Sequence, residues 1–137
     1  MFVHQERVRF FHTDAMKVTH HANYLRWFES ARVEFFRSAG VALADLMADG
    51  IVFPILHVEI DYIHASHYDD LLEIRTRLIK LTRAQVVFAY EIVRPKDQTL
   101  IVRGKTQGTF TSTETGKIIR MPQHYFEKLN AMLEPEE

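Results

Sequence analysis

The hydrophobic period of this sequence changes along the chain, and the change limits the folds that it can adopt. Apolar side chains recur every three or four positions between residues 22 and 38, which is typical of a helix with one wide apolar face. After Gly50, apolar and polar residues alternate in segments near 58–62, 72–79 and 86–93, which is typical of strands with one buried face. The sequence therefore predicts one long helix followed by consecutive strands.

Turn residues predict where the other elements begin and end. Gly40 is expected to cap the long helix at its C-terminus. Gly104 and Gly108 predict a bend or a close approach of another chain segment within the last strand. The remaining predicted elements are a strand over 3–11, a short helical piece over 41–47, a long strand over 99–113 and a C-terminal helix that starts at Pro122.

The connections between the predicted strands are short, so neighbouring strands must pair antiparallel. The long helix is the only element with an apolar face large enough to cover the sheet. We therefore predict an α+β fold in which an antiparallel sheet of five to six strands wraps around one central helix. With 137 residues, the chain has room for a single domain over 1–137. Such a sheet leaves open edges that a second copy would cover, which favours a homo-oligomer, either dimer or tetramer.

Charge and cysteine content argue against several classes of protein. The 17 Lys and Arg residues nearly balance the 18 Asp and Glu residues, so no excess positive field favours nucleic acid or an anionic membrane. The absence of cysteine excludes disulfides and a thiol nucleophile, and it fits a reducing compartment. No apolar run is long enough to span a membrane, and charges appear as early as Glu6 and Arg7. We predict a cytoplasmic protein with no membrane span.

The polar segment 12–21, between the first strand and the long helix, is predicted to be a loop that carries the chemistry. A helix N-terminus leaves backbone N–H groups unpaired and carries a positive dipole, so it stabilises negative charge on a carbonyl oxygen. The loop can fold Asp14 back beside that terminus as a nucleophile or a base, an arrangement that suffices for acyl transfer. The alternative is that Asp14 only serves as a turn or capping residue.

Two segments of the chain carry a resemblance to a known family. They are HTDAMKVTHHANYLRWFE over 12–29 and VEIDYIHASHYDDL over 58–71. The first resembles the signature of the hotdog-fold acyl-CoA thioesterases of the 4-hydroxybenzoyl-CoA thioesterase type, and the second resembles that family's strand, loop and strand. The resemblance implies an acyl-CoA thioester hydrolase with its active site at a subunit interface, and it includes the family's Tol-Pal-linked bacterial subfamily.

The resemblance also implies roles for particular residues. Asp14 would be the catalytic carboxylate, acting either as nucleophile or as general base on water. The backbone N–H near His21 would polarise the thioester carbonyl. The His21 side chain matches a histidine that recurs in the Tol-Pal-linked subfamily, although it could simply cap the helix or be solvated. Ala22, Asn23 and Tyr24 match substrate-binding positions, but Tyr24 also lies on the apolar face and would suit the core. No cofactor is implied beyond the coenzyme A of the substrate.

Two positions depart from the family pattern. Lys17 stands where relatives usually have glycine, so the loop is expected to bend differently. Phe10 stands where some relatives have a tyrosine, so any acid–base role of that tyrosine is absent. Lys17 would either keep Asp14 ionised through its charge or be an exposed lysine without a partner.

Other polar residues give weaker signals. Arg83 and Lys105 are candidate contacts for coenzyme A, or simply solvated charges. The histidines invite a metal hypothesis through three groupings, but none has the spacing of a closed site, and we predict no metal. The groupings are His12 with Asp14, His20 with His21, and His64 with His67.

Two other functions fit the same fold. One is a hydratase or dehydratase, because a fold does not fix its chemistry. The other is a catalytically silent acyl-CoA-binding protein, which the departures at Lys17 and Phe10 favour. An acyl carrier protein could replace coenzyme A as the acyl donor, but no basic patch for its docking stands out in the sequence.

Overall fold

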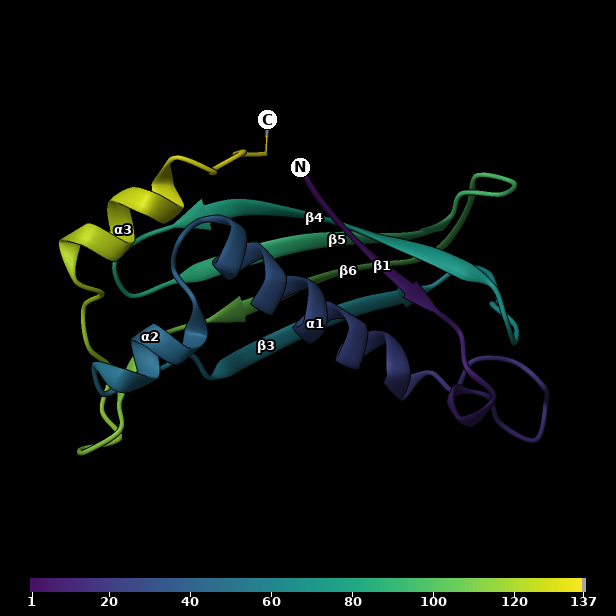
Figure 1. The fold of residues 1–137 in the computed structure, drawn as a ribbon, viewed down its shortest axis with the longest axis horizontal. Coiled ribbons are helices and arrows are strands. Elements are labelled where there is room, and N and C mark those ends of the chain that lie inside the picture. Colours follow the sequence, from purple (N-terminus) through teal and green to yellow (C-terminus); the bar gives the residue numbers. More distant parts are fainter. Residues whose placement is uncertain (137) are drawn as a thin grey trace.

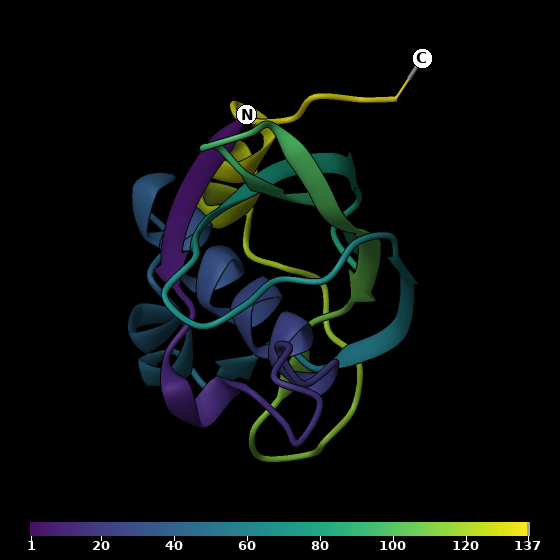
Figure 2. The same ribbon diagram turned by 90° about the vertical axis from the view of Figure 1, so that its right-hand side faces the viewer.

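A computed structural model describes residues 1–136, and its central feature is a curved antiparallel sheet wrapped around helix α1 (Ala22–Ser38) (Figure 1). The end-on view in Figure 2 shows the strands curling around this helix. The sheet has five strands in the order β1-β4-β5-β6-β3. This confirms the predicted α+β class and the hotdog arrangement of sheet and helix. The strands are β1 (Phe2–Arg7), β3 (Ile55–Tyr62), β4 (Leu71–Leu81), β5 (Val86–Arg94) and β6 (Thr99–Gly108).

Smaller elements lie around the sheet. The 3-10 helix η1 (Phe10–His12) follows β1, and helix α2 (Leu43–Ala48) follows α1. Strands β2 (Ile51–Val52) and β7 (Thr111–Ser112) form a separate two-stranded sheet, and α3 (Gln123–Asn130) lies near the C-terminus.

Three predicted boundaries were wrong. The strand expected over 3–11 ends at Arg7, because the chain turns into η1. The strand expected over 99–113 is divided, since β6 pairs with β3 and β5 whereas β7 pairs with β2. Pro122 caps α3 and is not its first helical residue, and the helix ends at Asn130. Pairing partners far away in the chain decide such ends, and local sequence does not record them.

The apolar face of α1 packs directly against the sheet. Phe28 is fully buried and stacks on Tyr90 of β5, with 4.1 Å between ring centroids. A Cβ atom at Gly104 would lie only 2.7 Å from the Phe28 ring, so glycine is required where the helix approaches β6. The predicted buried positions of the second and third alternating segments are confirmed. Burial alternates strictly along β4, whereas β5 also buries Ala89 and Val93 on its other face.

Strand β3 forms an open edge of the sheet. It pairs only with β6 among the described strands, and most of its side chains are exposed. The predicted apolar face of this strand stays partly uncovered within one chain, with Val58 at 40% and Tyr62 at 49% exposure. Between residues 1 and 136, no helix is long and apolar enough to cross a membrane.

Candidate active site

The loop that carries Asp14 is a tight turn closed by backbone hydrogen bonds. Lys17 N–H donates to the Asp14 carbonyl at 2.9 Å, and Asp14 N–H donates to the Val18 carbonyl at 3.0 Å. Thr13 and Thr19 form an antiparallel bridge just outside this turn. Lys17 has a φ of 66°, in the left-handed region that glycine adopts more readily than a lysine.

The Asp14 carboxylate is half-buried and held by one hydrogen bond. Its Oδ1 accepts the Met16 N–H at 2.8 Å, while Oδ2 accepts none from residues 1–136. Lys17 is exposed and forms no ion pair with Asp14 in this part of the chain, so it does not act as the electrostatic partner considered above. One carboxylate oxygen is therefore available to a ligand.

The first turn of α1 provides the complementary group. Ala22 N–H donates to Nδ1 of His20, and Asn23 N–H donates to the carbonyl of His20. The N–H of His21, the residue that precedes the helix, has no hydrogen-bond acceptor among the described residues. An unpaired N–H at the positive end of a helix is suited to bind a carbonyl oxygen.

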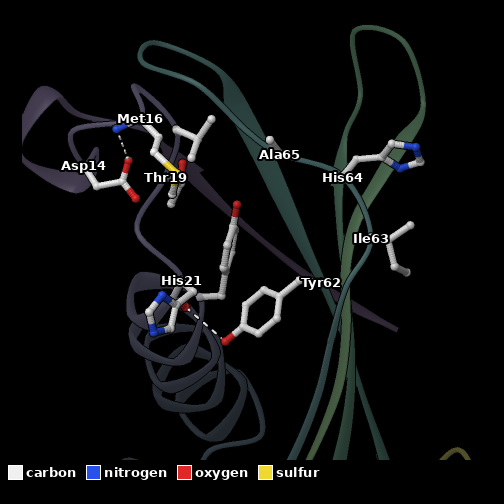
Figure 3. A pocket seen from close by; sticks show the side chains of 10 residues that line it. Asp14, Met16, Thr19, His21, Tyr62, Ile63, His64 and Ala65 are labelled. Atoms are coloured by element: carbon white, nitrogen blue, oxygen red, sulfur yellow. Dashed lines mark hydrogen bonds between the residues drawn. The ribbon is translucent and has the colours of Figure 1, made fainter.

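Asp14 and His21 line the same pocket, which has a volume of about 290 Å³. Figure 3 shows Asp14 on the loop beside this pocket, with the first turn of α1 and the end of β3 as the other walls. The lining residues are Asp14, Met16, Val18, Thr19, His21, Tyr24, Tyr62, Ile63, His64 and Ala65.

Residues 62–65 line the pocket, but none of them was predicted to bind substrate, although they lie in the second resembling segment. His64 was considered only in a metal grouping. The Tyr62 hydroxyl donates to the His21 carbonyl at 3.4 Å, so it lies against the start of the helix (Figure 3). Burial, and to a smaller extent the nearby Tyr24, raises the pKa of Tyr62. The sequence signal that could have identified Tyr62 as a pocket residue was its position at the end of an alternating strand, on the face expected to be buried.

Comparisons with known proteins agree with this geometry. Residues 8–129 match the family model of the thioesterase-like superfamily. The chain belongs to this superfamily. It is 32% identical to a putative esterase of Aquifex aeolicus, over 93% of this chain and 97% of that protein. It is 31% identical to the acyl-CoA thioesterase YbgC of Helicobacter pylori, over 92% of this chain and 98% of that protein.

A solved structure supports the same family. The DHNA-CoA thioesterase of Staphylococcus aureus superposes with a TM-score of 0.88 and 28% identity, over 95% of this chain and 91% of that chain. The predicted resemblance to hotdog-fold thioesterases is thereby confirmed, and this chain is a thioester hydrolase of that family.

Two residues predicted to bind substrate at the helix start do not line the pocket of the single chain. The Asn23 side chain is buried, donates to the His12 carbonyl at 2.8 Å and accepts from Arg26 at 3.2 Å. It therefore fastens η1 to α1. Ala22 also lies outside the pocket lining. Tyr24 does line the pocket, and it is also 3% exposed and part of the core, as its place on the apolar face predicted.

The two predicted coenzyme A contacts also lie away from the pocket of the single chain. Arg83 lies in the turn between β4 and β5, at the end of the sheet away from the Asp14 loop (Figure 1), and donates to the Met121 carbonyl. Lys105 pairs with Glu136 at 2.8 Å. It neighbours Gly104, which meets the helix, so its side chain points to the opposite face of the sheet. Neither cation reaches the pocket, because strand direction and alternation place them elsewhere.

The histidine groupings have other contacts. No group of three or more potential metal ligands occurs between residues 1 and 136. His12 Nδ1 accepts the Arg9 N–H at 2.8 Å, and its ring meets Trp27 edge to face. Burial, the largest effect, lowers the pKa of His12. The rings of His20 and His21 stack at 4.2 Å, and His64 contacts the Leu100 carbonyl.

Proposed function

We propose that this protein hydrolyses acyl-CoA thioesters, with Asp14 and the His21 backbone amide as its catalytic pair. The observation that carries the proposal is that Asp14 and His21 line one pocket, and that Asp14 Oδ2 and the His21 N–H each lack a hydrogen-bond partner among residues 1–136. The named relatives support the substrate class, since they include an acyl-CoA thioesterase and a CoA thioesterase of solved structure.

The reaction follows from the two groups. The His21 N–H donates to the thioester carbonyl oxygen and stabilises the negative charge that develops there. As a nucleophile, Asp14 would attack the carbonyl carbon, form an acyl anhydride and expel the coenzyme A thiolate, and water would then hydrolyse the anhydride. As a general base, Asp14 would instead take a proton from water while the hydroxide attacks, and that proton would pass to the leaving thiolate. Neither route uses a cofactor apart from the coenzyme A of the substrate.

The proposed assembly is a homo-oligomer whose interface covers β3 and completes the pocket. Support comes from the exposed apolar side chains along this edge, which continue from the strand into the pocket wall at Tyr62 and Ile63. An open apolar edge strand favours association with a second copy. In such an assembly, the partner would supply cationic side chains to the pocket, which Arg83 and Lys105 of the same chain do not reach. A cytoplasmic location stays a prediction, which the absence of cysteine supports.

The central test is Asp14→Asn. Asparagine keeps the Oδ1 acceptor for the Met16 N–H, so the loop and acyl-CoA affinity should be preserved. We expect kcat to fall by at least about 10²-fold, because a positioned acid–base or nucleophilic group is lost. Thiol release with a chromogenic reagent measures turnover, and binding of a non-hydrolysable acyl-CoA analogue measures affinity. Near-normal turnover in this variant would remove Asp14 from the mechanism.

The same assay separates the alternative functions. Purified protein is offered short, long and aromatic acyl-CoAs, and also acyl carrier protein thioesters. Release of thiol supports hydrolysis, whereas binding of acyl-CoA without thiol release from any donor supports a silent binding protein. A hydratase or dehydratase would change the acyl chain of an enoyl-CoA or hydroxyacyl-CoA while leaving its thioester intact, which mass spectrometry of the product detects.

A further inference from the structure

A buried chain of hydroxyl groups joins the three segments that surround the pocket. Ser66, in the loop between β3 and β4, is fully buried. Its Oγ lies 2.6 Å from Thr19 Oγ1 and 2.8 Å from the Tyr24 hydroxyl. We propose that Ser66 is a positioning residue that fixes the Asp14 loop relative to the start of α1. This inference rests on the proposed function and names the contact that sets its geometry.

The hydrogen-bond network favours one arrangement of the three segments, because its hydroxyl groups are buried and have no water to replace a lost partner. Thr19 is 5% and Tyr24 is 3% exposed. All three hydroxyl protons are satisfied when Tyr24 donates to Ser66 Oγ, Ser66 donates to Thr19 Oγ1, and Thr19 donates to the Ser66 carbonyl at 3.3 Å. A buried hydroxyl without a hydrogen-bond partner is unfavourable. Moving any one of the three segments would therefore cost free energy, because it would leave such a hydroxyl unpaired.

The network also lies next to both catalytic groups along the chain. Thr19 N–H donates to the Ser66 carbonyl at 2.9 Å, and Thr19 bridges Thr13, the residue before Asp14. Tyr24 belongs to the first turn of α1, which begins one residue after His21. Ser66 itself does not line the pocket. It can therefore act on the reaction only through the positions of the other two groups.

Removal of the network should lower kcat more than it raises KM. A misplacement of about 1 Å between reacting groups can reduce turnover by about 10²-fold, whereas binding depends on the whole pocket surface. We expect Ser66→Ala to lower kcat about tenfold or more and to change KM less than about threefold. Thr19→Val, which removes the hydroxyl and keeps a branched side chain, should lower kcat in the same way.

A second buried hydroxyl pair supplies the matched control. Thr106 on β6 is 3% exposed, and its Oγ1 lies 2.7 Å from the Tyr90 hydroxyl, outside the pocket lining. Thr106→Val removes a buried hydroxyl of similar burial, so it controls for a general loss of stability. We expect its kcat and KM to stay within about twofold of the natural protein.

The experiment combines steady-state kinetics with amide hydrogen exchange of the Asp14 N–H, which donates to the Val18 carbonyl, and of the Thr19 N–H, which donates to the Ser66 carbonyl. In Ser66→Ala, but not in Thr106→Val, exchange of these amides should accelerate at least about fivefold as the loop loses its anchor. Unchanged exchange in Ser66→Ala overturns the inference whatever the activity. Faster exchange with unchanged kcat overturns it as well. If the natural protein releases no thiol from any donor, the proposed function fails, and the exchange comparison still decides whether Ser66 anchors the loop.

Discussion

At the residue scale, Lys17 carries a long side chain on a backbone conformation that L-residues rarely adopt. Its φ of 66° lies in a region that costs an L-residue about 1–2 kcal/mol. The turn forms because its backbone hydrogen bonds and the Thr13–Thr19 bridge hold both of its ends. Local strain beside Asp14 is therefore compensated by neighbouring contacts.

This strain gives a stability prediction. Lys17→Gly removes it but adds about 0.5–1 kcal/mol of backbone entropy to be lost on folding, so we expect a net gain of about 0.5–1 kcal/mol in unfolding free energy. Chemical denaturation measures the change. Lys17→Ala is the matched control, because it removes the charge and keeps the Cβ atom. An equal gain in both variants would show that charge, and not backbone conformation, was the cause.

At the element scale, η1 depends on a neutral His12. The His12 Nδ1 accepts the Arg9 N–H, which a protonated ring cannot do. Burial lowers the pKa of His12 below the ordinary value of 6.5. The same residue contacts Trp27, and its carbonyl accepts from Asn23, so η1 is fastened to α1 through His12.

The sign of the pH effect follows from this lowered pKa. Just below pH 6.5 the unfolded chain binds a proton at His12 more readily than the folded chain does. We expect this contribution to stability to be complete above pH 6.5 and to be lost as the pH falls through the folded-state pKa. His12→Asn keeps an acceptor but does not titrate, so the pH dependence of its unfolding free energy between about 5 and 7 should be flatter. An identical slope in the two proteins would contradict this.

At the scale of the whole molecule, the two edge strands of the sheet differ in what they expose. Both β1 and β3 carry a valine that is 40% exposed, Val3 and Val58. Only β3 continues into the pocket wall, at Tyr62 and Ile63, and it also exposes Leu56 at 61%. The proposed subunit interface is therefore at β3.

The two valines provide a matched test of this interface. We expect Val58→Lys to place a charge in the proposed interface and shift the protein toward a 16.1 kDa monomer. Turnover should also be lost, because in the proposed assembly the partner completes the pocket. Val3→Lys makes the same chemical change on the other edge and should leave the oligomer intact. Light scattering at micromolar concentration measures both. A natural protein that is already monomeric, or a dimer lost only in Val3→Lys, would refute the β3 interface.

The sequence by itself determined the elements that have a strong period. Alternation along β4 and β5 and the three-to-four spacing of α1 record which face each element buries, so the helix bounds, Ala22–Ser38, and the sheet-around-helix arrangement were predictable. The motif around Asp14 was predictable for a related reason, because a short loop before a helix places its side chains near that helix's N-terminus.

Only the tertiary structure decided which residues meet from distant parts of the chain. Tyr62 reaches the pocket wall, and Ser66 reaches Thr19 and Tyr24 behind it, because β3 and the loop after it return beside α1. Alternation in β6 turns Lys105 to the opposite face. The division between β6 and β7 likewise depends on their partners, β3 and β2. The physical reason is that period and local propensity act over a few residues, while pairing and packing are fixed by contacts between residues tens of positions apart.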